Sequence, residues 1–276
     1  MIRIIDGSRY QYLVNDTGTQ IIKYFDWSKL LGLSDSLRPQ LIIWRLGVGN
    51  YYEDITFPDV YKHCMDADMP LMAYFPLRYV VKTYTWQSQR DWIKKLYSKY
   101  PGVLTLVQDN EIKEGDEQTA TSVVQNIGNW FSDWQGVPWI NYTSEGWCDE
   151  YLLWWSGLAD IPLFIASYLN AGLYPLTDPS LSPVMPNIYK QHNIEPMLWQ
   201  CSTDKPAANM MGATYGAQSK SIDISKFMGT DEEWPSFLAK FGKVISPPIP
   251  PTPVQTWQQA VDVFLRGMGY TGPTIT

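Results

Sequence analysis

The triplet Asp109-Asn110-Glu111 is the part of the sequence whose residue types and spacing most directly suggest chemistry. It follows the apolar run VLTLV, which predicts a buried strand. Side chains two residues apart on a strand point to the same face, with Cα atoms roughly 6.6 Å apart, so both carboxylates can converge on one bound bond. Hydrolysis of a glycosidic bond requires such a pair: one carboxyl group, kept protonated, donates a proton to the leaving oxygen, while the other stays ionised and stabilises the oxocarbenium-like centre. Asp109 and Glu111 are therefore candidate catalytic residues.

The strands that must position this pair are predicted by short apolar runs bounded by turn residues. Most runs are continuous rather than alternating, which is typical of parallel strands buried on both faces. The predicted strands are Ile2 to Ile5, Leu41 to Leu46, Leu71 to Phe75, Val103 to Val107, Pro138 to Tyr142, Leu163 to Ala166, Met197 to Gln200 and Ser221 to Ile224.

Helices are predicted between the earlier strands, where apolar residues recur at helical spacing over residues 57–66, 86–100 and 117–134. Alternating strands and helices predict an α/β fold with a parallel sheet, and eight strands predict a closed, TIM-like β/α barrel. Residues 169–196 contain five prolines. We therefore expect an incomplete helix ring in the second half of the barrel.

Functional side chains of such a barrel gather at the carboxyl ends of its strands. Reading those ends adds two carboxylates to the candidate pair, Asp6 after the first strand and Asp223 on the eighth. The other strand ends carry Arg45, Tyr74, Tyr142, and Trp199 with Gln200. A single charge at such a position is more often part of a solvated rim, so only the group of four carboxylates on three strands points to chemistry.

Composition excludes several classes of function. With 21 basic and 28 acidic residues, a net charge of −7 and a pI near 4.9, the chain lacks the positive charge that a nucleic-acid partner requires. Two histidines cannot form a three-histidine metal site, there is no GxSxG motif, and the three cysteines show no CxxC spacing. We predict no metal site, no cofactor, and buried, reduced cysteines. The 13 Trp and 18 Tyr residues suit sugar binding, but they also suit the filling of a large core.

The chain is expected to have one large domain and a short appendage. Residues 1–245 are assigned to the barrel, the proline-rich stretch 246–253 to a linker, and residues 254–276 to a short amphipathic tail that is too small for an independent domain. The tail is expected to dock on the barrel or on a partner, or to be the remnant of a wall-binding module. The N-terminal residues do not resemble a signal peptide, and no run is long enough for a membrane span. We expect a monomer without an export signal of its own.

Ten segments of the sequence together resemble glycoside hydrolase family 25, the Chalaropsis-type lysozymes common among phage endolysins and bacterial autolysins. The resemblance covers residues 1 to about 235. The segments follow the family's order and read IIDGS, FDW, LIIWRLGVG, EDITF, MAYF, QDNE, PWINYT, PLFIASY, LWQ and SIDISKF.

This resemblance implies a barrel that cleaves the β-1,4 bond between N-acetylmuramic acid and N-acetylglucosamine in peptidoglycan. It implies Glu111 as general acid and base, and Asp109 as the group that stabilises an oxazolinium-like or oxocarbenium-like centre, with retention and help from the substrate's N-acetyl group. Asp6 and Asp223 would complete the acidic cluster. The implied substrate-binding residues are Tyr74, Tyr142, Trp199, Tyr168 and Arg45, with Arg45 expected mainly to balance the charge of the cluster.

Four departures from the family pattern leave substrate detail open. The first loop, after Asp6, is longer than usual, and Gln108, Phe164 and Ser225 replace the residue types common at their positions. None of these departures removes a carboxylate.

Three functions remain in competition. The first is an active muramidase, most simply a phage or prophage endolysin made in the cytoplasm that reaches the cell wall through a holin or as part of a virion. The second is a catalytically silent glycan-binding or virion protein, which would gain nothing from mutually repelling carboxylates. The third is a barrel glycosidase of another specificity, such as a chitinase-like enzyme, whose DxxDxDxE run is absent here.

Overall fold

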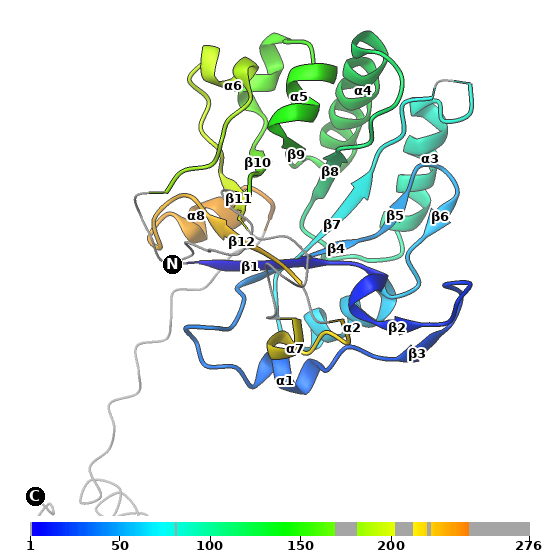
Figure 1. The fold of residues 1–276 in the computed structure, drawn as a ribbon, viewed down its shortest axis with the longest axis vertical. Helices are drawn as coiled ribbons and strands as arrows, with labels where there is room; N and C mark the ends of the chain where they lie inside the picture. Colours follow the sequence, from blue (N-terminus) through cyan, green and yellow to red (C-terminus); the bar gives the residue numbers. More distant parts are fainter. Residues whose placement is uncertain (1, 81, 169–180, 202–211, 220–221, 243–276) are drawn as a thin grey trace, which may run out of the picture. The chain divides into compact units, whose positions relative to one another are not determined.

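The computed structural model describes residues 2–80, 82–168, 181–201, 212–219 and 222–242, and within them eight strands close into a barrel (Figure 1). The strands pair in the order β1-β12-β11-β10-β9-β8-β7-β4. Their bounds are Arg3–Gly7 (β1), Leu41–Arg45 (β4), Leu71–Pro76 (β7), Leu106–Asn110 (β8), Ile140–Ser144 (β9), Leu163–Ala166 (β10), Leu198–Gln200 (β11) and Asp223–Phe227 (β12). Each matches one predicted strand, which confirms the predicted α/β barrel.

Burial explains why these segments form strands. Every residue of β4 and of β10 is buried, because one face of each strand fills the barrel and the other packs under helices or loops. Short, continuous apolar runs satisfy both faces at once.

The direction of β12 differs from the prediction. This strand runs antiparallel to both of its neighbours, β1 and β11, whereas the other barrel pairs are parallel. The expected all-parallel sheet is therefore wrong at its last strand. The reversal brings the N-terminal end of β12, and not its C-terminal end, to the carboxyl ends of the other strands.

Long helices cover the first half of the barrel, as predicted. They are α2 (Phe57–Asp66), α3 (Trp86–Tyr97) and α4 (Glu117–Gln135). Side-chain caps begin two of them: Thr85 accepts from the N–H of Ser88, and Asp116 from that of Thr119. Gly128 of α4 lies against the buried ring of Trp139, where a larger side chain would collide, so this glycine allows α4 to pack closely on the barrel.

The second half has only short helices among the described residues, which confirms the expected thinning of the ring. They are α5 (Glu145–Tyr151), the 3-10 helix η2 (Ser156–Asp160), α6 (Asn187–Gln191), α7 (Gly212–Tyr215) and α8 (Trp234–Ala239). No helix in the described ranges is long and apolar enough to cross a membrane.

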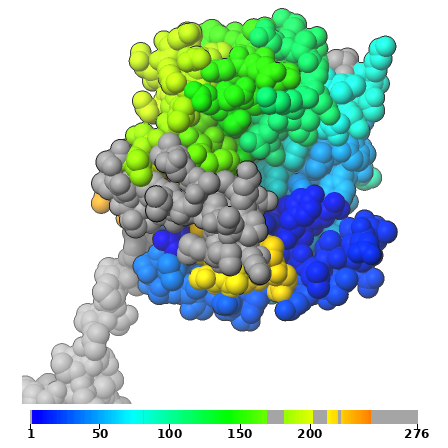
Figure 2. Space-filling view, viewed as in Figure 1, coloured from blue at the N-terminus to red at the C-terminus, as the bar shows by residue number. Residues whose placement is uncertain are grey.

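The long first loop carries structure that the sequence did not reveal. After Asp6 it forms the 3-10 helix η1 (Arg9–Gln11) and a hairpin of β2 (Leu13–Val14) and β3 (Ile21–Lys23), and it continues into α1 (Trp27–Leu31). A second hairpin, β5 (Gly47–Val48) with β6 (Tyr52–Glu53), follows β4. Figure 2 shows the first loop, in dark blue, on the surface of the molecule.

The division of the C-terminal part of the chain into a linker and a tail remains a prediction. The chain divides into a compact unit over residues 1–243 and a second unit over 244–276. The predicted linker, 246–253, and tail, 254–276, lie outside the described residues.

Candidate active site

A pocket at the carboxyl ends of the parallel strands brings together all four predicted carboxylates. Asp6 comes from β1, Asp109 from β8, Glu111 from the residue after β8, and Asp223 from the start of β12. The pocket is lined by Asp6, Ile43, Tyr74, Val107, Asp109, Glu111, Tyr142, Phe164, Gln200 and Asp223. Phe164, a departure noted in the sequence, is thus part of the pocket wall.

Asp6 and Asp223 face each other across the antiparallel pair of β1 and β12, where they are register partners. Asp223 reaches the mouth because β12 begins there. Its placement at the mouth was predicted, but for a strand running the other way.

Gln200 connects Asp6 to two tyrosines. Its Nε2 donates to Asp6 Oδ1 at 2.8 Å, and its Oε1 accepts from the Tyr142 hydroxyl at 2.7 Å and from the Tyr168 hydroxyl. Ser225 Oγ donates to the other oxygen, Oδ2, of Asp6 at 3.1 Å. Both oxygens of Asp6 are therefore held by neutral donors, so its orientation is fixed.

The roles of Gln200 and Ser225 were not predicted from the sequence. Gln200 stood at a predicted strand end, and Ser225 was noted as a departure from the family pattern, so both carried a signal. The missing information was the direction in which each side chain points.

Burial and neighbouring charges determine the pKa values of the two catalytic carboxyl groups. Burial raises the pKa of Asp109 well above its usual value, and the negative charges of Glu111 and Asp6 raise it further, while Arg45 opposes them. Desolvation by the pocket walls around the Glu111 carboxyl group also raises its pKa, and the neighbouring Tyr142 hydroxyl opposes this rise. The rest of the Glu111 residue is exposed at the rim of the pocket. A carboxyl group that keeps its proton to higher pH is suited to act as an acid.

Three of the four predicted aromatic residues lie at the site. Tyr74 and Tyr142 line the pocket, and Tyr168 is 46% exposed beside it, held through its bond to Gln200. An exposed ring whose hydroxyl is already oriented can stack on a sugar.

The structure contradicts the predicted position of Trp199 in the pocket. Its side chain is fully buried on the outer face of β11, where Nε1 donates to the Ser167 carbonyl oxygen at 2.8 Å and Lys226 Nζ lies 4.5 Å from the ring centroid. Successive side chains on a strand face opposite sides, so Gln200 points into the pocket and Trp199 away from it. The predicted role of Trp199 in a sugar subsite is therefore wrong.

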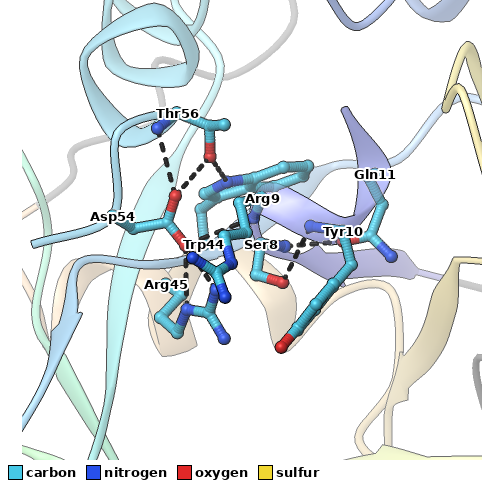
Figure 3. A network of polar contacts seen from close by, with 8 residues as sticks. All are labelled: Ser8, Arg9, Tyr10, Gln11, Trp44, Arg45, Asp54 and Thr56. Atoms are coloured by element: carbon cyan, nitrogen blue, oxygen red, sulfur yellow. Dashed lines mark hydrogen bonds and ion pairs between the residues drawn. The ribbon is translucent and has the colours of Figure 1, made fainter. Parts of the chain in front are cut away.

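Arg45 has the balancing position expected of it. Its Nε and Nη2 each lie 2.8 Å from Oδ2 of the fully buried Asp54, whose other oxygen accepts from the Thr56 hydroxyl at 2.7 Å (Figure 3). Thr56 in turn accepts from Trp44 Nε1 at 3.0 Å. This network holds the positive charge of Arg45 near Asp109, where it partly offsets the rise in the pKa of Asp109.

The histidines and cysteines lie apart from this pocket. His63 stacks on Trp27 and His192 on Trp154, with ring centroids 5.0 and 3.4 Å apart. All three cysteines are buried and free, as predicted.

A family model and several solved structures are similar to this chain. The family model "Glycosyl hydrolases family 25" matches residues 5–202. No curated protein sequence matches the chain.

Three solved structures share the fold at low sequence identity. A family 25 glycosyl hydrolase from Bacillus anthracis is 16% identical, with a TM-score of 0.61, over 85% of this chain and 92% of that one. A bacterial lysozyme from Streptomyces coelicolor is 16% identical, with a TM-score of 0.61, over 87% and 96%. The catalytic domain of endolysin ply40, from bacteriophage P40 of Listeria monocytogenes, is 16% identical, with a TM-score of 0.56, over 87% and 97%.

The family match extends from the second half of β1 through β11 and thus includes Asp6, Asp109 and Glu111. Because the match covers most of the chain, the protein belongs to glycosyl hydrolase family 25 and is a glycoside hydrolase.

Proposed function

We propose that this enzyme is a muramidase that cleaves the β-1,4 bond between N-acetylmuramic acid and N-acetylglucosamine in bacterial peptidoglycan. The observation that carries the proposal is the convergence of Asp6, Asp109, Glu111 and Asp223 in one pocket of a family 25 chain. A protein that only bound a glycan would bear the cost of this repulsion without benefit.

In the proposed reaction, Glu111 acts first as an acid. Its carboxyl proton passes to the glycosidic oxygen as the bond to the anomeric carbon breaks, and the leaving sugar departs as an alcohol. The positive charge that develops on the remaining sugar is shared with its own N-acetyl oxygen and stabilised by the Asp109 carboxylate. Glu111, now ionised, then takes a proton from the water that attacks the anomeric carbon, which restores the starting state with retention.

The supporting residues have distinct tasks. Asp6 and Asp223 maintain negative charge around the pair, and Gln200 with Ser225 keeps Asp6 oriented. Tyr74 and Tyr142 in the wall, and Tyr168 beside it, provide apolar faces and hydroxyls for the sugar rings.

For its biological setting, we propose a phage or prophage endolysin. One of the similar solved structures is the catalytic domain of an endolysin, which supports this setting. The enzyme would then be made as a monomer in the host cytoplasm and reach the wall through a holin, or it would be carried by the virion.

The test is digestion of purified peptidoglycan by the wild type and by Glu111→Gln, with mass spectrometry of the released fragments and their reducing ends. Glutamine changes the charge of residue 111 but hardly its volume, so the fold should be unaffected. We expect reducing-end N-acetylmuramic acid from the wild type alone.

Two results would contradict the proposal. Activity retained in Glu111→Gln would remove Glu111 from its role. Failure of the wild type to release fragments from walls of several chemotypes, together with retained glycan binding, would favour the silent glycan-binding protein.

A further inference from the structure

The first loop places a second arginine beside Arg45. The guanidinium carbon of Arg9 lies 5.4 Å from the ring centroid of Tyr10 and 5.1 Å from that of Tyr52. The guanidinium carbon of Arg45 lies 5.2 and 5.4 Å from the same two rings. Two cations and two aromatic rings thus form one compact group, which we call the Arg9 cluster (Arg9, Tyr10, Arg45 and Tyr52).

The Arg9 cluster carries an unbalanced positive charge. Asp54 receives the side chain of Arg45 but only the backbone N–H of Arg9, at 3.2 Å. In the part of the chain that the structure describes, no carboxylate lies within ion-pair distance of the Arg9 guanidinium. Asp54 therefore balances the charge of Arg45 but forms no ion pair with the Arg9 guanidinium, in a protein whose net charge is −7.

The Arg9 guanidinium packs against the protein although no carboxylate of the described residues pairs with it. Arg9 is half-buried, and the hairpin turn at Gly18 packs directly against its guanidinium group, where a side chain would collide with it. Gly18 has a φ of +67°, so the turn also needs glycine for its backbone conformation. Ordering a long side chain beside a like charge costs free energy, which a bound anion would offset.

The cluster adjoins the catalytic pocket. Arg45 is the last residue of β4 and the register partner of Tyr74, which lines the pocket, and its charge acts on Asp109. Figure 3 shows the guanidinium groups of Arg9 and Arg45 close together beneath Asp54, with Tyr10 beside them. Tyr10 is 61% exposed, so a ligand can reach the group.

We propose that the Arg9 cluster is a subsite for a carboxylate carried by the glycan substrate. Guanidinium groups bind carboxylates through paired, charge-assisted hydrogen bonds, and the flanking rings fit the apolar stem that carries the anion. The inference rests on the proposed function, because that substrate has two sources of carboxylate: the lactyl group of muramic acid, where the peptide is absent, and the peptide stem. The subsite would also give an acidic enzyme a local attraction for an anionic wall.

The experiment compares three substrates in their KM and kcat for release of reducing ends. The first is intact peptidoglycan. The second is glycan strands stripped of peptide by an amidase, which exposes the lactyl carboxylates. The third is the stripped strands with their carboxylates capped as methylamides.

The variants isolate the charge of Arg9. We expect Arg9→Gln to raise KM about fivefold on a carboxylate-bearing substrate, as loss of a partly exposed ion pair does, with little change in kcat. Arg9→Lys should recover part of the loss. Lys23→Gln, which removes an exposed positive charge from the same loop, should behave as wild type.

Capping should make the wild type and Arg9→Gln alike, because the anion is then absent. An Arg9 effect on stripped strands identifies the lactyl carboxylate, and an effect on intact peptidoglycan alone identifies the peptide stem. The difference should shrink at high salt.

The subsite would be overturned by an unchanged KM of Arg9→Gln on both carboxylate-bearing substrates, or by an equal rise on capped strands, which would mean that Arg9 acts through the loop structure. Failure of the proposed function is a different result: the wild type would then release reducing ends from none of the substrates.

Discussion

The two faces of strand β8 differ in how their polar groups are paired. Asp109 faces the pocket with Glu111, where the carboxylates repel each other and burial opposes their ionisation. Asn110 faces the surrounding helices and belongs to a chain of neutral hydrogen bonds, each 2.6 Å long: Tyr79 donates to Asn110, Asn110 to Asn141, and Asn141 to Tyr189.

This chain joins four separate parts of the barrel. Tyr79 follows β7, Asn110 ends β8, Asn141 lies in β9 and Tyr189 in α6, and all four side chains are fully buried. On the same face, Gln108 is fully buried against α4, with an amide orientation that bonds the Val124 carbonyl oxygen at 3.2 Å and the Gly128 N–H at 2.9 Å.

One short strand can therefore hold repelling carboxylates on one face while the polar groups on its other face are hydrogen-bonded. The outer face satisfies its buried polar groups completely, as buried groups require. The rigidity gained there allows the pocket face to hold like charges together. Because successive side chains of a strand point to opposite faces, the residues of β8 that stabilise the fold are different from those that act in the pocket.

The largest expected effect comes from the pocket face. Asp109→Asn should lower the rate of wall hydrolysis about 10²- to 10³-fold, because it removes the charge that stabilises the transition state. The same variant should raise Tm at pH 7 by about 2–4 °C, because the folded state no longer contains a buried, repelled carboxylate.

The sign of the stability change depends on pH. The folded pKa of Asp109 is raised, so its ionised form is destabilising above that pKa, and the penalty vanishes below the unfolded value of about 3.9. The Tm difference should therefore grow as the pH rises from about 3.9 towards the folded pKa of Asp109 and disappear towards pH 4. Asp133→Asn, at an exposed position on α4, is the control and should show no such rise. A lower Tm for Asp109→Asn at pH 7 would contradict the strain on this face.

The next effect comes from the outer face. Asn110→Leu leaves the Tyr79 hydroxyl and the Asn141 side-chain oxygen buried without their partner, so the free energy of unfolding should fall by about 3 kcal/mol in urea titrations. Asn126→Leu is the matched control, since among the described residues the Asn126 amide bonds to Ser122 of its own helix alone, and it should change stability by less than about 0.5 kcal/mol. Equal stabilities of the two variants would mean that the chain of amides does not support β8.

The smallest effect sharpens the comparison within the pocket. Tyr142→Phe removes a hydroxyl group that lowers the pKa of Glu111, so this pKa should rise and the alkaline limb of the kcat/KM profile should move to higher pH. Tyr168→Phe is the control, because it also loses a hydrogen bond to Gln200 but Tyr168 does not lower the pKa of Glu111. The alkaline limb of the kcat/KM profile of Tyr168→Phe should therefore stay in place. A shift of the limb to lower pH in Tyr142→Phe would exclude Glu111 as the acid that this limb reports.

Much of the fold was predictable because its signals are local. Apolar runs predicted all eight barrel strands, and helical spacing predicted α2, α3 and α4. The small hairpins were missed because their strands are only two or three residues long, too short to show a period.

The facing of side chains was less predictable. In β11 every residue is buried, so no alternation of polar and apolar residues indicates which face is inside. The sequence therefore favoured Trp199 over Gln200 on residue type alone. Asp223 was placed correctly at the mouth although β12 is reversed, since parallel and antiparallel strands have the same local pattern.

Local sequence was enough to determine the strands, the long helices and the presence of Asp109 and Glu111 on one face, because each depends on a period of two or 3.6 residues. Closure of the barrel decided the rest. Only closure brings Gln200 to Asp6, 194 positions earlier in the chain, and places Arg9 of the first loop against Tyr52 of the next. Such contacts depend on which strands become neighbours and in which direction they run, and no local pattern encodes either property.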